Sequence, residues 1–288
     1  MKTIHRLAAA AAALLISASA AAGPQFTFTA IPDENEARLK ERFDKVAVYL
    51  GKQLGVDTKF VPVKSYPAAV TAFRNNEVQL AWFGGLTGVQ ARRAVPGSQA
   101  IAQGAEDAAF VSYIIANAAT GLKPSKEFPR GIAGKSFTFG SKSSTSGRLM
   151  PEFFIREATK KSPEELFSRV GFSGDHSKTL ELVQTGAYDV GALNYSVYKN
   201  EVQAGKVDPA KVVVLWETPA YPDYQWTVRG DADATFGKGF MQKLTKALLD
   251  MNDKALLDSF ERSKFIPASN KDYAPIENTA KSIGLLDE

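Results

Sequence analysis

Short apolar runs alternate with amphipathic stretches along almost the entire chain. Seven runs rich in β-branched and aromatic residues predict strands, at 26–31, 59–62, 79–83, 112–117, 136–140, 189–194 and 212–216. Between them, apolar residues recur at helical spacing, most clearly in 36–54 and 240–250. Because strands that alternate with helices build layered sheets, this pattern predicts an α/β protein with mainly parallel sheets.

An internal repeat relates the two halves of the chain. Residues 73–84 align without gaps with residues 183–194, and each copy reads as a helix end, a polar turn and a buried strand. One copy in each half favours two similar lobes with a cleft between them. Ligands of α/β sheets gather beyond the carboxyl ends of strands, so Gly84, Asn194 and Tyr195 are pocket candidates. The alternative is that such units recur in any fold of this class without functional meaning.

Hydroxyl side chains fill the junction between the strand predicted at 136–140 and a helical pattern at 148–160. The first amides of a helix have no partner within it and lie at its positive end, where an anion can bind. The hydroxyls of Ser144, Thr145 and Ser146 would add donors for a compact tetrahedral oxyanion. An ordinary N-cap is the alternative interpretation.

The first 22 residues have the pattern of a secretory signal peptide: a basic start, an apolar alanine-rich core and small residues for cleavage. We therefore expect residues 1–22 to be removed and the mature protein to act in the periplasm. Removing Lys2 and Arg6 lowers the net charge from +4 to +2, which gives no argument for nucleic-acid binding. The chain has no cysteine, so it can form neither disulfides nor a thiolate metal site.

Catalysis finds little support in the sequence. Ser146, His176 and Asp189 have the residue types of a hydrolytic triad, but the Gly-x-Ser-x-Gly turn is missing. The chain has no phosphate-binding loop, no dinucleotide fingerprint and no histidine cluster for zinc. We expect a binding protein without catalytic residues, metal or cofactor, with a phospho-ester hydrolase as the remote alternative.

Five ordered motifs resemble the substrate-binding proteins of ABC transporters for phosphonate, phosphite and related oxyanions. They are Phe28-Thr29-Ala30-Ile31-Pro32, Pro62-Val63-Lys64-Ser65-Tyr66, Leu80-Ala81-Trp82-Phe83-Gly84-Gly85, Ser143-Ser144-Thr145-Ser146-Gly147 and Gly174-Asp175-His176. The resemblance covers almost the whole mature chain. It implies the two-lobed periplasmic binding protein fold (type II), with two parallel-rich mixed sheets, a hinge and an interlobe cleft.

The resemblance also implies a binding site. Ser144, Thr145, Ser146 and His176 would hold the anion, and Tyr66 and Phe83 would close over it from the first lobe. Tyr221, after the last strand of the second lobe, is a further cleft candidate. An anion beside His176 would favour the imidazolium and raise its pKa, which predicts tighter binding at pH 6 than at pH 8.

The lips of the predicted cleft carry no obvious carboxylate, unlike relatives that hold an aminoalkyl phosphonate. We therefore expect a small, nearly bare oxyanion, and the sequence also resembles a branch of the family associated with selenate uptake. Without a carboxylate acceptor, fully ionised ligands such as selenate would be favoured over protonated phosphonate or phosphite. The alternative is that Asp175 or a backbone carbonyl accepts the proton.

The expected mechanism is closure of two lobes around one anion. Lobe one would comprise residues 23–117 and 219–288, and lobe two residues 118–218. The protein, expected to be a monomer, would then dock on an inner-membrane permease with its ATPase. The alternative is a sensor that hands its ligand-bound form to a membrane histidine kinase.

Overall fold

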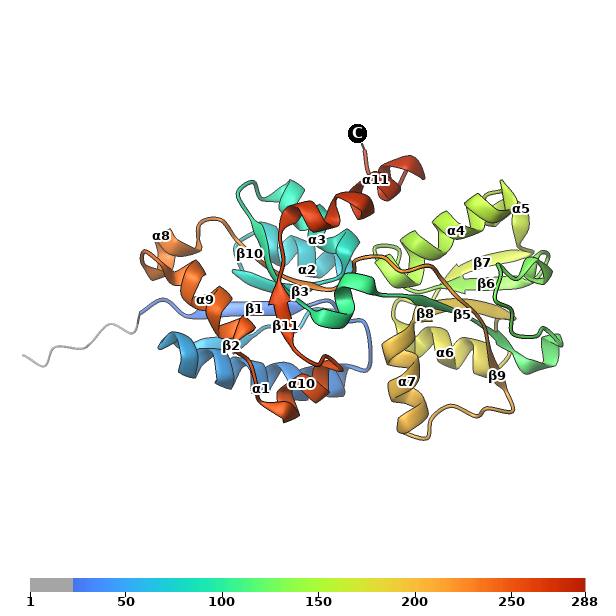
Figure 1. The fold of residues 1–288 in the computed structure, drawn as a ribbon, viewed down its shortest axis with the longest axis horizontal. Coiled ribbons are helices and arrows are strands. Elements are labelled where there is room, and N and C mark those ends of the chain that lie inside the picture. The colour runs from blue at the N-terminus through green and yellow to red at the C-terminus, as the bar shows by residue number, and fades with distance from the viewer. Residues whose placement is uncertain (1–22, 288) are drawn as a thin grey trace, which may run out of the picture.

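The computed structural model describes residues 23–287, which form two lobes lying side by side (Figure 1). The strands are β1 (Phe26–Ala30), β2 (Thr58–Phe60), β3 (Leu80–Phe83), β4 (Gln99–Gly104), β5 (Ser112–Asn117), β6 (Ser136–Phe139), β7 (Arg169–Phe172), β8 (Val190–Asn194), β9 (Val212–Glu217), β10 (Gln225–Val228) and β11 (Phe265–Pro267). They form a six-stranded sheet, ordered β11-β4-β10-β3-β1-β2, and a five-stranded sheet, ordered β7-β6-β8-β5-β9.

Both sheets are mixed. In the first sheet, β1 pairs in parallel with β2 and β3, whereas β10 is antiparallel to β3 and β4. In the second sheet, β6 is parallel to β7 and β8, whereas β5 is antiparallel to β8 and β9. Because β5 and β10 each follow a crossing between the lobes, they enter their sheets from the opposite direction. The predicted α/β class and two-lobed architecture are confirmed. Parallel pairs do not predominate as expected: each sheet has two, beside three antiparallel pairs in the first sheet and two in the second.

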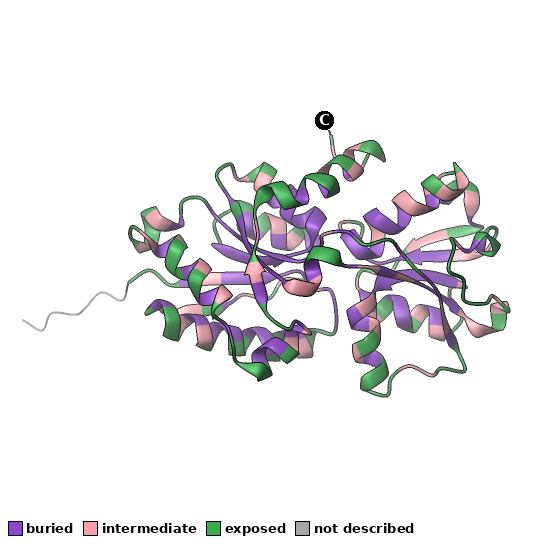
Figure 2. Cartoon of the chain, viewed as in Figure 1, coloured by how far each residue is buried: buried purple, intermediate pink, exposed green. Residues whose placement is uncertain are grey.

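Helices cover the faces of both sheets (Figure 1). They are α1 (Glu36–Leu54), α2 (Tyr66–Arg74), α3 (Gly85–Ala94), α4 (Met150–Thr159), α5 (Pro163–Leu166), α6 (His176–Gln184), α7 (Tyr195–Gln203), α8 (Ala232–Phe236), α9 (Phe240–Leu249), α10 (Lys254–Phe260) and α11 (Ala274–Ser282). Their apolar faces meet the sheets in separate cores, one around Phe28 and Trp226 and another around Phe137. Figure 2 shows the buried strands between helices whose outer faces are exposed.

The internal repeat is present in the structure. Helix α2 leads through a turn into β3, and α6 leads through the matching turn into β8. Asn76 and Gly186, which occupy the same position of the repeat, both adopt positive φ, 60° and 77°. Asparagine and glycine tolerate this left-handed conformation best, so the two turns close in the same way.

The chain crosses between the sheets twice, after β4 and after β9. The two crossings are joined at Phe110 and Tyr221, whose backbones exchange hydrogen bonds of 2.8 and 2.9 Å. Strand β5, which the expected boundary at residues 117 and 118 assigned to lobe one, pairs with β8 and β9 in the second sheet. The chain therefore enters the second sheet at the start of β5, not at its end.

Among residues 23–287, no helix is long and apolar enough to span a bilayer. The predicted signal peptide, residues 1–22, lies outside the described residues.

Candidate functional site

Four helical segments begin where the two lobes meet. Lobe one provides the starts of α2, at Tyr66, and α3, at Gly85; lobe two provides α6, at His176, and a π-helical turn, Thr145–Leu149. A helix start carries unpaired amides and partial positive charge. Four such starts at one junction favour an anion there without a lysine or arginine beside it.

The predicted hydroxyl segment forms the start of the π-helical turn and is buried. Ser144 caps the turn, its Oγ accepting the amide of Gly147 at 2.9 Å. Thr145 Oγ1 accepts the amide of Leu86 from lobe one at 2.9 Å, and the carbonyl of Ser146 accepts the Ser112 hydroxyl at 2.6 Å. The segment is therefore both a cap and a contact between lobes.

His176 is fully buried and begins α6. Its amide donates to the carbonyl of Asp33 in lobe one at 2.9 Å, and its Nδ1 accepts the amide of Asn194 at 3.3 Å. The ring proton therefore sits on Nε2, which is buried and has no partner among the described residues. His176 presents one neutral N–H donor.

The surroundings of the His176 ring favour the neutral form over the expected imidazolium. Burial lowers the pKa of His176 to about 3, and a proton on Nδ1 would face the backbone N–H of Asn194. Other groups at the junction are therefore candidates for a pH dependence near neutrality.

Two carboxylates that the sequence analysis missed supply such groups. Asp33 and Asp223, both from lobe one, are buried, and burial raises the pKa of each to about 7. Asp223 Oδ1 accepts the amide of Gly85 at 2.8 Å, and the hydroxyls of Thr145 and Ser146 lie close enough to lower its pKa. The expectation of a site without carboxylates is thereby overturned.

Tyr66 completes the site from the first turn of α2. Its hydroxyl is buried and forms no hydrogen bond within residues 23–287. Burial, with the charges of Asp33 and Asp223 among the smaller causes, raises its pKa well above the usual value, while nearby Ser144 lowers it. The Tyr66 hydroxyl therefore stays protonated and can donate.

Four buried polar atoms at the junction lack partners in the described part of the chain. Two are donors, Tyr66 Oη and His176 Nε2, and two are acceptors, Asp33 Oδ1 and Asp223 Oδ2. Each would be costly to bury unpaired. This set matches a small molecule that both accepts and donates hydrogen bonds.

Other predicted residues have supporting positions. Gly84 lies where the lobes touch: a Cβ there would stand 3.1 Å from Asp223 Oδ1 and 3.2 Å from Thr145 Oγ1. Asn194 is buried at the junction, caps α7 and donates to the Tyr224 hydroxyl at 2.9 Å.

Three predicted residues are held by packing or by other partners and contribute none of the unpaired atoms. Phe83 packs against Phe73 in the core of lobe one, with ring centroids 5.6 Å apart. Tyr221 lies at the crossing, its hydroxyl 2.5 Å from Ser112 Oγ. Tyr195 packs on Phe110 beside the crossing, 4.8 Å between centroids.

The sequence pattern could have indicated one of the two missed aspartates but not the other. Asp33 follows β1 by three residues, so the rule that ligands bind beyond the carboxyl ends of strands could have found it. Asp223 precedes the antiparallel strand β10, where that rule gives no guidance, and only the pairing of β10 with β3 brings it to Gly85.

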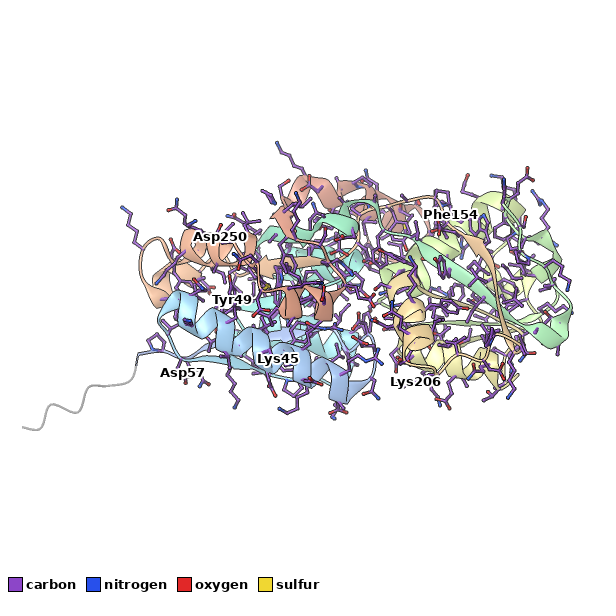
Figure 3. The ribbon with its side chains drawn as sticks, turned by 60° about the horizontal axis from the view of Figure 1, so that its bottom comes forward. Lys45, Tyr49, Asp57, Phe154, Lys206 and Asp250 are labelled. Carbon is purple, nitrogen blue, oxygen red and sulfur yellow. The ribbon has the colours of Figure 1, made fainter. Side chains whose placement is uncertain are left out.

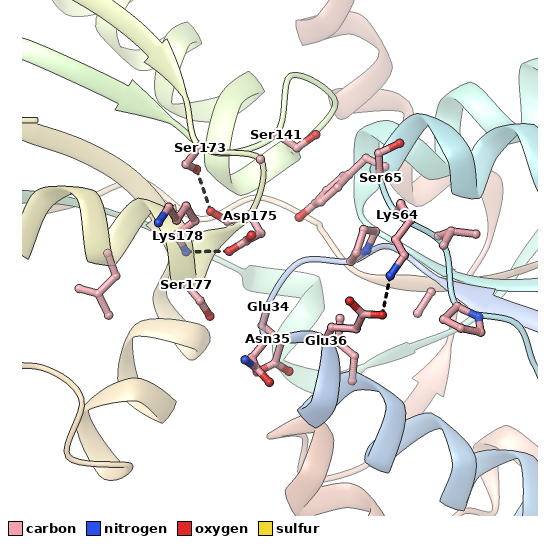
Figure 4. A pocket seen from close by; sticks show the side chains of 18 of the residues that line it. Glu34, Asn35, Glu36, Lys64, Ser65, Ser141, Ser173, Asp175, Ser177 and Lys178 are labelled. Atoms are coloured by element: carbon pink, nitrogen blue, oxygen red, sulfur yellow. Dashed lines mark hydrogen bonds and ion pairs between the residues drawn. The ribbon is translucent and has the colours of Figure 1, made fainter. Parts of the chain in front are cut away.

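A cavity of about 730 Å³ lies between the lobes and is lined by residues of both. Figure 4 shows Ser141, Ser173 and Asp175 on one side of it and Lys64 and Ser65 on the other. Tyr66 also lines this cavity, which therefore reaches one of the residues of the junction.

The described residues contain no group of three or more histidines, cysteines or acidic residues that could hold a metal ion. The site chemistry rests on hydroxyls, amides, one neutral imidazole and two carboxyl groups.

Comparison with known proteins agrees with this architecture. The family described as "ABC transporter, phosphonate, periplasmic substrate-binding protein" matches residues 28–273. The probable ABC transporter phosphite binding protein PhnD1 of Prochlorococcus marinus is 40% identical over 264 residues, which cover 89% of each chain. The phosphonates-binding periplasmic protein of Escherichia coli is 22% identical, covering 88% of this chain and 75% of that protein.

Among solved structures, PhnD1 of Prochlorococcus marinus in complex with methylphosphonate superposes with a TM-score of 0.87 at 39% identity, covering 91% of this chain and 99% of that chain. A binding protein component of an ABC phosphonate transporter from Pseudomonas aeruginosa has a TM-score of 0.78 at 21% identity, covering 89% and 85%. These proteins are binding components and not enzymes. The chain belongs to the family of phosphonate-type periplasmic substrate-binding proteins of ABC transporters.

Proposed function

We propose that this protein captures a small phosphorus oxyanion, phosphite or methylphosphonate, for an ABC importer by closing its lobes around the ligand. The observation that carries the proposal is the set of four unpaired buried atoms, two donors and two acceptors, at the lobe junction. A phosphorus oxyanion that keeps one proton near neutral pH accepts from Tyr66 and His176 and donates to a carboxylate. PhnD1, named as a phosphite binding protein and solved with methylphosphonate, supports the same class.

The carboxylates remove the reason for favouring selenate. A fully ionised selenate or sulfate brings no proton, so Asp33 and Asp223 must take protons from solvent or repel it. Near pH 7 a phosphorus oxyanion can still carry one proton, which selenate and sulfate cannot. We infer that near pH 7 selenate and sulfate bind more weakly than a phosphorus oxyanion that carries one proton.

We infer that lobe one comprises residues 23–111 and 218–288 and lobe two residues 112–217, with hinges at the crossings joined by Phe110 and Tyr221. The mature protein, after loss of residues 1–22, works in the periplasm as a monomer. Its closed form docks on a membrane permease that a cytoplasmic ATPase drives.

A thermal-shift screen of the mature protein tests the proposal, with phosphite, methylphosphonate, aminoethylphosphonate, phosphate, sulfate and selenate at pH 7. A ligand at a hundred times its Kd stabilises by about 2.7 kcal/mol, which raises the melting temperature measurably. We expect phosphite or methylphosphonate to give the largest shift, and Thr145→Ala and Tyr66→Phe to reduce it. An equal or larger shift with selenate would contradict the proposed substrate class.

A further inference from the structure

Four buried residues at the lobe junction form a closed ring of hydrogen bonds. The Tyr224 hydroxyl donates to Asp33 Oδ2 at 2.7 Å and accepts from Asn194 Nδ2 at 2.9 Å. The backbone N–H of Asn194 donates to His176 Nδ1 at 3.3 Å, and the backbone N–H of His176 donates to the backbone carbonyl of Asp33 at 2.9 Å. All four residues are 5% exposed or less.

The ring divides evenly between the lobes. Lobe one holds the pair of Asp33 and Tyr224, and lobe two holds the pair of His176 and Asn194. Only two of the four bonds, from the His176 amide and from Asn194 Nδ2, cross between the lobes. Each lobe therefore carries a preformed half, and closure joins the halves.

Tyr224 is held in place for this contact. Its ring stacks on Trp82, with centroids 5.5 Å apart and planes 22° apart, and the Arg262 guanidinium lies 5.6 Å from its centroid. A hydroxyl fixed in this way loses little further freedom when the lobes meet. The Tyr224 hydroxyl is thus a preorganised contact for Asn194.

The ring also holds two of the four unpaired atoms at the junction. The Asn194 amide sets the His176 tautomer, which places the proton on Nε2, and the Tyr224 hydroxyl occupies Asp33 Oδ2, which leaves Oδ1 unpaired. Groups that fix a tautomer in this way act on the ligand through the residue they hold.

We propose that this ring is a latch that couples lobe closure to the orientation of His176 toward the ligand. Closure completes the ring, and the ring in turn holds the His176 side chain in place. Asp33 and Tyr224 are positioning residues. The latch rests on the proposed function for its ligand, but its hydrogen bonds join the lobes whatever the anion is.

The test measures lobe closure and affinity separately. The chain has no cysteine, so Val48→Cys on α1 and Val202→Cys on α7, 76% and 46% exposed, accept spin labels that report the distance between lobes. Tyr224→Phe removes only the bridging hydroxyl. We expect it to reduce the closed fraction, with and without methylphosphonate, and to weaken methylphosphonate binding about tenfold, because Asp33 Oδ2 and Asn194 Nδ2 lose their partner.

Tyr49→Phe is the matched control. The Tyr49 hydroxyl, labelled in Figure 3, donates to the carbonyl of Ala247 within lobe one, so its loss should leave the lobe distance and the affinity unchanged. If Tyr224→Phe does not fold, Asp33→Ala should open the lobes while Asp33→Asn, which keeps an acceptor for Tyr224, should not.

A Tyr224→Phe protein that closes and binds like wild type would overturn the latch, as would a wild-type protein with no closed fraction under either condition. If methylphosphonate fails to bind the wild-type protein, the proposed function falls, yet the distances without added ligand still decide whether the ring joins the lobes.

Discussion

At the scale of single residues, the pH dependence of binding separates His176 from Asp223. Asp223 has a pKa of about 7 through burial, so it ionises as the pH rises and then repels an anion. We expect the affinity for phosphite to fall between pH 6 and pH 8, by up to about tenfold per pH unit for each proton linked to binding.

Two variants show which residue causes this change of affinity with pH. Asp223→Asn should flatten the slope relative to wild type, whereas His176→Ala should lower the affinity by about ten- to a hundredfold at every pH, because a hydrogen bond to a charged ligand is lost. Calorimetric titrations of the three proteins against phosphite at both pH values make the comparison. A flat slope in His176→Ala with an unchanged slope in Asp223→Asn would restore the imidazolium.

Gly84 controls how closely the lobes approach. A Cβ at this position would meet Asp223 Oδ1 at 3.1 Å and Thr145 Oγ1 at 3.2 Å, and both atoms belong to the closed junction. We expect Gly84→Ala to weaken phosphite binding at least about tenfold, since one or two kcal/mol of crowding is typical of such changes. Its stability without ligand should change little.

The matched control is Gly51→Ala in α1, where the nearest atom would lie at an ordinary 3.4 Å and alanine suits the helix better. It should bind like wild type. Wild-type affinity in Gly84→Ala would mean that the lobes close less tightly than this structure shows.

At the scale of elements, a buried ion pair within lobe one attaches the C-terminal part of the chain to the segment that follows β4. Arg262, between α10 and β11, donates to both carboxylate oxygens of Asp107 at 2.8 and 2.6 Å, and both residues are buried. Arg262→Ala should lower the free energy of unfolding by about 3–5 kcal/mol, because it leaves a buried carboxylate uncompensated.

Denaturant unfolding measures that loss, with Lys254→Ala as the control, because the pair of Lys254 with Asp258 is exposed and worth under about 1 kcal/mol. Burial already raises the pKa of Asp107, and losing Arg262 raises it further. The loss should therefore shrink at low pH, where Asp107 takes up a proton. A loss near that of Lys254→Ala would refute a structural role for the pair.

At the scale of the whole molecule, the two raised aspartates link closure to pH. Burial is the first cause of both shifts, with Glu34 adding to that of Asp33 and Asp107 to that of Asp223. A pKa raised in the closed form from 3.8 to about 7 stabilises that form fully below pH 3.8, and the contribution is lost as the pH rises through 7.

Solution scattering without added ligand should therefore show a larger radius of gyration at pH 8 than at pH 6. The double variant Asp33→Asn, Asp223→Asn should remove the difference, because neither side chain then titrates. A radius that does not change with pH in the wild-type protein would show that these carboxyls are not buried by closure.

Much of the architecture follows from the sequence alone. Helix α1 has the predicted bounds, and the repeat correctly paired the turn at Asn76 with the turn at Gly186, because apolar periodicity and turn residues are local properties. Strands β4, β7, β10 and β11 were missed. In β4, the run Gln-Ala-Ile-Ala-Gln-Gly has low β propensity and forms a strand only through its neighbours.

The sequence pattern placed the hydroxyls and His176 at helix starts, and the resemblance to the family grouped them as one site. Only the tertiary structure decided their chemistry. Burial made His176 a neutral donor, and the antiparallel return of β10 brought Asp223 and Tyr224 to the junction from about 80 residues beyond the hydroxyl turn. A pKa and a contact between lobes depend on what surrounds a residue in space, which no local pattern records.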